Sequence, residues 1–192
     1  MPNWCANSLK IKPKTTRAKY ALERHIMPEL KKGQECRLFN AIIPMPQELI
    51  DTVCGSVEES KRAAHAAQMQ ANIEKHGYPT WYEFANAKWG TKWDACEPTH
   101  QVNEDGSVTI WFDTAWSPPM PIYEKLEEMG FEVEATYCEC GIGFVGWYAD
   151  GEDNEYEINF FSDDGDDDSS NERMEAFFRA EGLTHSPAHI GG

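Results

Sequence analysis

The sequence predicts an α+β fold in which helices cover one face of an antiparallel sheet. Three observations lead to this prediction. Residues 107–114, which follow the turn Asn103–Gly106, combine β-branched and aromatic residues and form the clearest strand. Residues 131–137 alternate between apolar and polar side chains, and residues 142–148 can return as a hairpin partner. The resulting order is strand, helix, helical insertion, strand, helix and three strands, which is typical of this architecture.

The first strand and the first helix follow from the N-terminal residues. Residues 4–12 alternate well enough for a strand. A helix is expected from about residue 15 to residue 32, with Thr15 or Thr16 as its N-cap. Pro28 lies inside this helix and is expected to kink it or to end it, because proline lacks the backbone N–H that a helix needs.

Residues 47–88 are expected to form a helical insertion. Ser56 and Glu59 have the spacing of a capping box, which would open an alanine-rich helix that ends near His76. Residues 81–88 are expected to form a further helix, capped by the threonine that precedes them.

The chain is expected to form one α+β domain over residues 1–160, with the helical insertion inside it. A helix at 122–129 and a last strand at 156–161 complete this domain. Residues 161–192 are expected to form an acidic linker, a short helix at 171–180 and a loose tail.

Composition restricts the class of protein. The chain has 192 residues, which suits one domain. It has no apolar run of about 18 residues that could span a membrane, and its N-terminus lacks the basic and apolar regions of a signal peptide. We therefore expect a cytoplasmic protein, and we expect its six cysteines to be reduced thiols.

The charge is divided unevenly along the chain. Residues 1–96 contain 14 Lys/Arg and 10 Asp/Glu, a net charge of +4, whereas residues 97–192 contain 3 and 23, a net charge of −20. An acidic body repels nucleic-acid phosphates and attracts basic partners. Direct nucleic-acid binding is therefore the least favoured hypothesis, and it would use a basic patch at the N-terminus: Lys10, Lys12, Lys14, Arg17 and Lys19. A solvated acidic surface that only keeps the protein in solution is the simpler interpretation of the charge.

Three aromatic-rich segments are candidates for a pocket. They contribute seven residues: Trp89, Lys92, Trp93, Asp94, Trp116, Tyr137 and Glu139. A mostly apolar concavity with a few polar groups is typical of a small-molecule or peptide site. The alternatives are core packing for each tryptophan, and a structural salt bridge from Lys92 to Asp94 or Glu139. If Glu139 is buried on its glycine-rich turn, it could instead act as a general base.

The sequence predicts neither a metal site nor a cofactor. Cys138 and Cys140 point to one face of a strand, but no spacing in the chain resembles a zinc site. The acidic run Asp163–Asp168 lacks the glycine and the terminal glutamate of an EF-hand loop. A solvated charged loop is the favoured interpretation of this run.

Several motifs together resemble one known family. They are the opening Met-Pro-Asn-Trp-Cys-Ala-Asn-Ser-Leu, the loop Ile42–Pro46, the segment Trp89–Asp94, the segment Thr114–Pro119, and Tyr137…Glu139…Gly141…Phe144…Gly146. In this order they resemble the YubB-like family of plasmid and phage proteins over roughly residues 1–160. Pro13-Lys14 stand where that family usually has a glycine. The resemblance implies a ferredoxin-like domain and a setting on mobile genetic elements, and it implies no reaction.

Two functional hypotheses follow. The first is a non-enzymatic binding protein, in this setting an anti-defence inhibitor of the anti-CRISPR kind, whose acidic surface blocks a basic host protein such as a defence nuclease complex. That surface is expected to contain Asp150, Glu152, Asp153, Asp163, Asp164, Asp166, Asp167 and Asp168. The second is an enzyme or small-ligand module whose site contains Trp89, Lys92, Asp94, Trp116 and Glu139.

Overall fold

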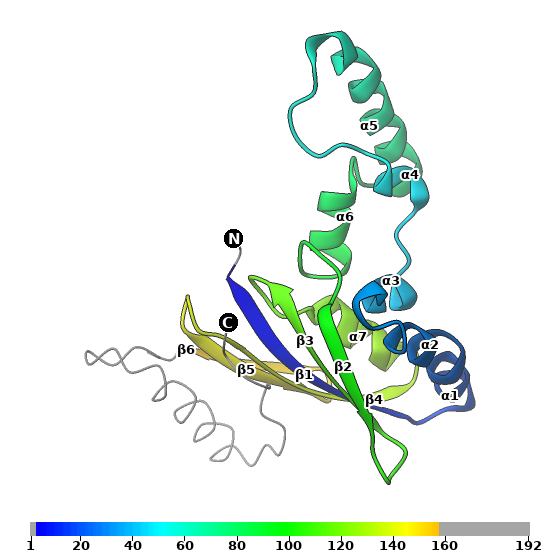
Figure 1. Cartoon of the computed structure of the whole chain (residues 1–192), viewed down its shortest axis with the longest axis vertical. Coiled ribbons are helices and arrows are strands. Elements are labelled where there is room, and N and C mark those ends of the chain that lie inside the picture. Colours follow the sequence, from blue (N-terminus) through cyan, green and yellow to red (C-terminus); the bar gives the residue numbers. More distant parts are fainter. Residues whose placement is uncertain (1–2, 158–192) are drawn as a thin grey trace, which may run out of the picture.

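A computed structural model describes residues 3–157 and shows a six-stranded antiparallel sheet in the order β2-β3-β1-β4-β5-β6 (Figure 1). The strands are β1 (Trp4–Pro13), β2 (Cys96–Val102), β3 (Val108–Ala115), β4 (Phe131–Glu139), β5 (Phe144–Ala149) and β6 (Glu152–Glu157). Within this sheet β1 is central, because it pairs with β3 on one side and with β4 on the other. The predicted α+β class and its antiparallel sheet are confirmed.

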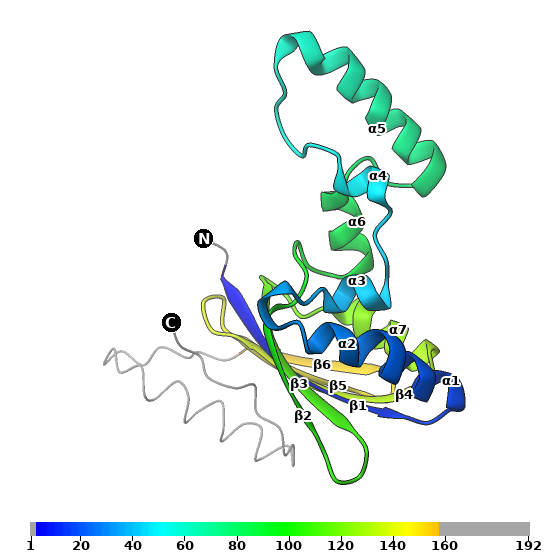
Figure 2. The same ribbon diagram turned by 45° about the vertical axis from the view of Figure 1, so that its right-hand side comes forward.

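Helices cover one face of this sheet (Figure 2). They are α1 (Thr16–Ala21), a π-helical turn (Leu22–Ile26), α2 (Met27–Leu30), α3 (Leu38–Ile42) and α7 (Met120–Glu128). The insertion adds α4 (Gln47–Ile50), α5 (Arg62–His76) and α6 (Trp81–Lys88), and short 3-10 turns occur at Gly33–Glu35 and Glu59–Lys61. In Figure 1 the insertion rises away from the sheet, with α5 farthest from it.

The main core lies between the sheet and its helices. Leu9 and Ile11 of β1 are buried there, opposite Ile110 and Val108 of β3. The predicted alternation along β1 therefore sends every second side chain, including Leu9 and Ile11, toward the helices. Tyr123 of α7 is fully buried in the same layer, where its hydroxyl donates to Asn7 Oδ1 at 3.0 Å.

One strand was missed and one expected strand was misplaced. β2 was not predicted, because its sequence Cys-Glu-Pro-Thr-His-Gln-Val has little apolar alternation and contains Pro98, which is tolerated at a sheet edge. The last strand was expected at 156–161, but β6 begins at Glu152. The two-residue turn Asp150-Gly151, with φ of 51° and 77°, pairs Ala149 directly with Glu152. The expected linker, helix and tail after residue 160 lie outside the described residues.

Helix starts were predicted with mixed success. Thr15 accepts a hydrogen bond from Ala18 N at 3.0 Å, as expected of an N-cap. The expected capping box at Ser56 is not formed, because α5 begins only at Arg62, after a 3-10 turn. Pro28 does not end the helix, which continues to Leu30, and the irregularity of the helix begins before the proline. The preceding turn widens to a π-helix in which Met27 N donates to Leu22 O, and this adjusts the hydrogen-bond ladder before the proline.

Candidate functional site

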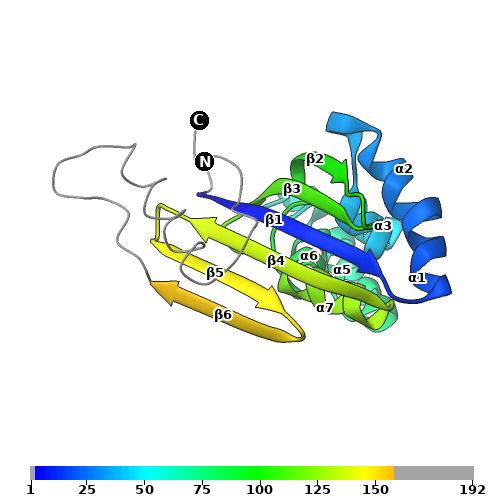
Figure 3. The ribbon, with the colours of Figure 1, turned by 90° about the horizontal axis from the view of Figure 1, so that it is seen from below.

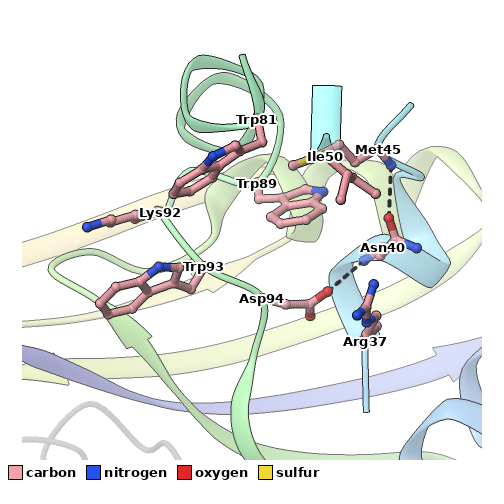
Figure 4. A pocket seen from close by; sticks show the side chains of 9 residues that line it. All are labelled: Arg37, Asn40, Met45, Ile50, Trp81, Trp89, Lys92, Trp93 and Asp94. Atoms are coloured by element: carbon pink, nitrogen blue, oxygen red, sulfur yellow. Dashed lines mark hydrogen bonds between the residues drawn. The ribbon is translucent and has the colours of Figure 1, made fainter. Parts of the chain in front are cut away.

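A pocket of about 260 Å³ lies where the insertion meets the sheet domain (Figure 4). Its lining residues come from the start of α3, the loop that follows α3, α4, α6 and the turn after α6. They are Arg37, Asn40, Met45, Ile50, Trp81, Trp89, Lys92, Trp93 and Asp94. Three indole rings, two apolar side chains and two cationic groups therefore surround one concavity, which is the arrangement expected of a ligand site.

Helix α6 and the residue that follows it provide two of the three tryptophans. Thr80 accepts a hydrogen bond from Tyr82 N at 3.2 Å and so caps the helix just before Trp81, as predicted. Trp89 follows the last turn, and Gly90 at a φ of 79° reverses the chain. The indole of Trp89 is 6% exposed and donates to Ile43 O at 3.0 Å, so it forms a fixed wall of the pocket.

Asp94 joins the two halves of the pocket. Its carboxylate accepts hydrogen bonds from Phe39 N at 2.8 Å, Asn40 N at 3.1 Å and Ala95 N at 2.8 Å. It therefore caps the first turn of α3 from a distant part of the chain. Burial raises the pKa of Asp94, although the three N–H donors act in the opposite direction. Because its oxygens already have donors, this carboxylate serves as a structural anchor.

The two cationic side chains of the pocket have no carboxylate partner within residues 3–157. No ion pair there includes Arg37 or Lys92, so the expected salt bridge from Lys92 to Asp94 or Glu139 is not formed. The Lys92 ammonium instead lies 4.6 Å from the centroid of the Trp93 ring. In Figure 4, Lys92 reaches out between Trp81 and Trp93, and Arg37 lies beside Asn40 on the opposite side. Arg37 still acts electrostatically on Asp94, where its charge opposes the rise in pKa, so Lys92 is the charge more available to an anionic ligand.

Three of the seven candidate residues do not line this pocket. Trp116 lies beyond the end of β3, is 48% exposed and has a φ of 74°. Tyr137 is fully buried, and its hydroxyl donates to Asp153 Oδ1 at 2.5 Å. Glu139 accepts hydrogen bonds from Gly141 N at 2.8 Å and Ile142 N at 2.5 Å, so it holds the turn between β4 and β5. Glu139 is 1% exposed, so the burial that a general base would need is present, but both of its oxygens already accept backbone N–H groups, and its role as general base stays a prediction.

Sequence reasoning missed five lining residues: Arg37, Asn40, Met45, Ile50 and Trp81. Two features of the sequence could have indicated some of these residues. One is the apolar segment before Pro46, and the other is Trp81 at the start of a predicted helix. Nothing local to Arg37 indicated that it would line the same pocket as Lys92. Their place in one pocket depends on the hydrogen bonds from α3 to Asp94, which join residues 54 and 55 positions apart.

The structure shows the surroundings of the six cysteines and of the N-terminal basic patch. All six thiols are free, and Cys138 Sγ lies 3.2 Å from Cys140 Sγ. Among the residues that the structure describes, no three His, Cys, Asp or Glu side chains gather as a metal site. The expected N-terminal basic patch is partly neutralised by three ion pairs, which are Lys10–Glu134 at 3.0 Å, Lys12–Asp105 at 2.9 Å and Lys14–Glu132 at 3.5 Å.

A separate acidic edge lies at the β6 side of the sheet. It is defined by five exposed carboxylates: Asp150, Glu152, Asp153, Glu155 and Glu157. None of the five has a cationic partner in the part of the chain that the structure describes. Burial, followed by the neighbouring charges of Asp153 and Glu157, raises the pKa of Glu155. The other acidic candidates, Asp163, Asp164, Asp166, Asp167 and Asp168, lie outside the described residues.

Comparison with known proteins finds one family that is similar to the second half of the chain. Residues 88–181 match the family described as the ferredoxin-like domain in Api92-like protein. This Api92-like match covers just under half of the chain and confirms the ferredoxin-like domain. It contains the pocket residues Trp89 to Asp94, whereas β1 and the rest of the pocket lie before it. The YubB-like assignment and the plasmid or phage setting stay predictions.

Solved structures add one further likeness. The crystal structure of a protein api92 from Yersinia pseudotuberculosis has 12% sequence identity and a TM-score of 0.43, with 82% of this chain and 98% of that chain covered. No curated protein matches the chain. In the part of the chain before residue 158, no helix is both long and apolar enough to cross a bilayer.

Proposed function

We propose that this protein is a non-enzymatic binding protein whose pocket holds a planar aromatic group that carries negative charge. The observation that carries the proposal is the pocket itself, where three indoles stand beside two cationic groups that form no ion pair within residues 3–157. Asp94 is the only carboxylate among the lining residues, and three backbone N–H groups occupy it. The pocket therefore offers recognition groups and no free acid–base pair.

The chemistry of the lining favours a nucleotide. A base that stacks on an aromatic side chain gains about 1–3 kcal/mol, and this gain depends little on which base it is. Arg37 and Lys92 can then contact a phosphate, since guanidinium and ammonium groups both form charge-assisted hydrogen bonds with phosphate oxygens. The volume of 260 Å³ suits one base with its phosphate more than an extended chain.

The test is a tryptophan-fluorescence titration with adenosine monophosphate and with adenosine. Trp93→Ala is expected to weaken binding of the nucleotide about 5- to 150-fold, the equivalent of one stacked base. Lys92→Gln is expected to weaken binding of the nucleotide but not of the nucleoside, because it removes only a charge. Trp116→Ala is the matched control, since that indole is also exposed but lies outside the pocket. Equal losses in the Trp93 and Trp116 variants, or no saturable signal, would contradict the proposal.

A second candidate function uses the acidic edge. Five exposed carboxylates, without cationic partners in the described part of the chain, support docking on a basic protein, and the YubB-like resemblance would make that partner a host nucleic-acid-binding protein such as a defence nuclease complex. In this function the protein acts as an anti-defence inhibitor that covers the partner's basic surface. Asp153 is partly engaged by the Tyr137 hydroxyl, so the other four carboxylates would provide most of the attraction.

Binding through this edge is expected to weaken with salt and with acid. Salt screens exposed charges over about 10 Å at 0.1 M. Because the pKa of Glu155 is raised, this carboxyl takes up a proton at a higher pH than usual, and acidification removes its charge early. Capture of a purified basic nuclease can be compared between the wild type and a Glu152→Gln, Glu155→Gln, Glu157→Gln variant. A Glu58→Gln, Glu59→Gln variant on the insertion is the control. Capture that is unchanged by the edge variant and by salt would exclude this function.

A further inference from the structure

The sheet face opposite the helices, here called the open face, carries a second buried layer. Ala6, Cys138 and Val145 are 7%, 1% and 0% exposed, yet none of them belongs to the main core. They alternate along their strands with residues that point toward the helices. Figure 3 shows the sheet from the side on which no described helix lies. The described residues therefore provide no secondary-structure element that covers this layer.

Three buried polar atoms on the open face have no hydrogen-bond partner among residues 3–157. They are Ser8 Oγ, Trp147 Nε1 and Asn154 Nδ2. The strand register places them in one row, since Ser8 pairs with Thr136, Thr136 with Trp147, and Trp147 with Asn154. A buried polar group without a partner costs about 1–3 kcal/mol. A row of three such groups across β1, β5 and β6 indicates that polar and apolar groups from elsewhere meet this face.

We propose that residues 158–192 of the same chain cover the open face. These 35 residues follow directly from β6, which forms one edge of the face. They contain the apolar residues that such a cover needs: Ile158, Phe160, Phe161, Met174, Phe177, Phe178 and Leu183.

The dimensions and the charge of the chain support this occupant. The helix that the sequence predicts at residues 171–180 would be about 15 Å long. The row from β1 to β6 spans three strand spacings, which is about 14 Å. A second copy of the chain is the less favoured occupant, because a net charge of −16 opposes self-association.

The reactivity of Cys138 tests the proposal in the full chain. Its thiol lies on the open face, whereas Cys5 is 0% exposed on the helix side and serves as an internal reference. In a Cys140→Ser background, Phe177→Ser with Phe178→Ser is expected to speed alkylation of Cys138 by about tenfold or more while Cys5 stays protected. Alkylation of Cys138 at an unchanged rate would overturn the proposal.

In one outcome both Cys138 and Cys5 become reactive. A photo-crosslinking amino acid at position 111, on the open face of β3, then tests the proposal. Crosslinks to residues 158–192 within one chain would then support the proposal. Crosslinks between two chains, or none to residues 158–192, would overturn it. If the crosslinks join two chains, protection of Cys138 is also expected to weaken when the protein is diluted. A second copy dissociates on dilution, whereas a segment of the same chain stays tethered.

Discussion

Replacing Asp94 by alanine is expected to destabilise the folded protein by about 2–4 kcal/mol and to abolish binding in the pocket. The substitution leaves the N–H groups of Phe39 and Asn40 without their acceptor at the start of α3. These bonds also hold α3 against the turn that carries Lys92 and Trp93. Losing them separates the two halves of the pocket, so stability and binding are expected to fall together.

Urea denaturation and the fluorescence titration measure the two effects. Asp94→Asn is expected to lose less stability than alanine, because its carbonyl can still accept from Phe39 N while its amide faces the donor Asn40 N. Glu104→Ala is the control, since this exposed carboxylate in a turn is expected to change stability by no more than about 0.5 kcal/mol. A stable Asp94→Ala protein with unchanged binding would show that α3 is held by its apolar contacts alone.

The sequence predicted those elements whose cause is local. The alternation in β1, β3 and β4, and the threonine caps at Thr15 and Thr80, need only neighbouring residues to be recognised. β2 was missed because an edge strand can be polar and can contain a proline. Its place in the sheet comes from pairing with β3, which the residues of β2 do not reveal by themselves.

The candidate site was predicted in part, for a related reason. Trp89, Lys92, Trp93 and Asp94 are close in sequence, so a single turn brings them together in the pocket. Tyr137 and Glu139 were grouped with them because they are unusual residues beside glycines. Their hydrogen-bond partners lie at the β4–β6 end of the sheet. Tyr137 donates to Asp153, and Glu139 accepts from the backbone of the turn after β4. Residue type indicated a special environment there but not its purpose.

The position of Tyr137 leads to the second large effect. Gly146→Ala is expected to destabilise the protein by about 3 kcal/mol, at the upper end of what overpacking usually costs. Gly146 pairs with Tyr137 across β4 and β5, and a Cβ atom at residue 146 would overlap the ring and the hydroxyl of that tyrosine. The ring is fully buried and its hydroxyl is bonded to Asp153, so it cannot move aside without losing that bond.

A double-mutant cycle separates this overlap from a general weakness of alanine in the strand. Tyr137→Phe alone is expected to cost about 1 kcal/mol, for the hydrogen bond to Asp153. In a Tyr137→Ala background, Gly146→Ala is expected to cost much less than in the wild type, because the ring that it would strike is gone. Thermal unfolding of the four proteins gives the coupling energy. If the two costs simply add, the ring does not depend on Gly146, and the glycine would instead be required by the backbone of β5. Coupling of about 2 kcal/mol would show that residue 146 is glycine because Tyr137 occupies the space of its side chain.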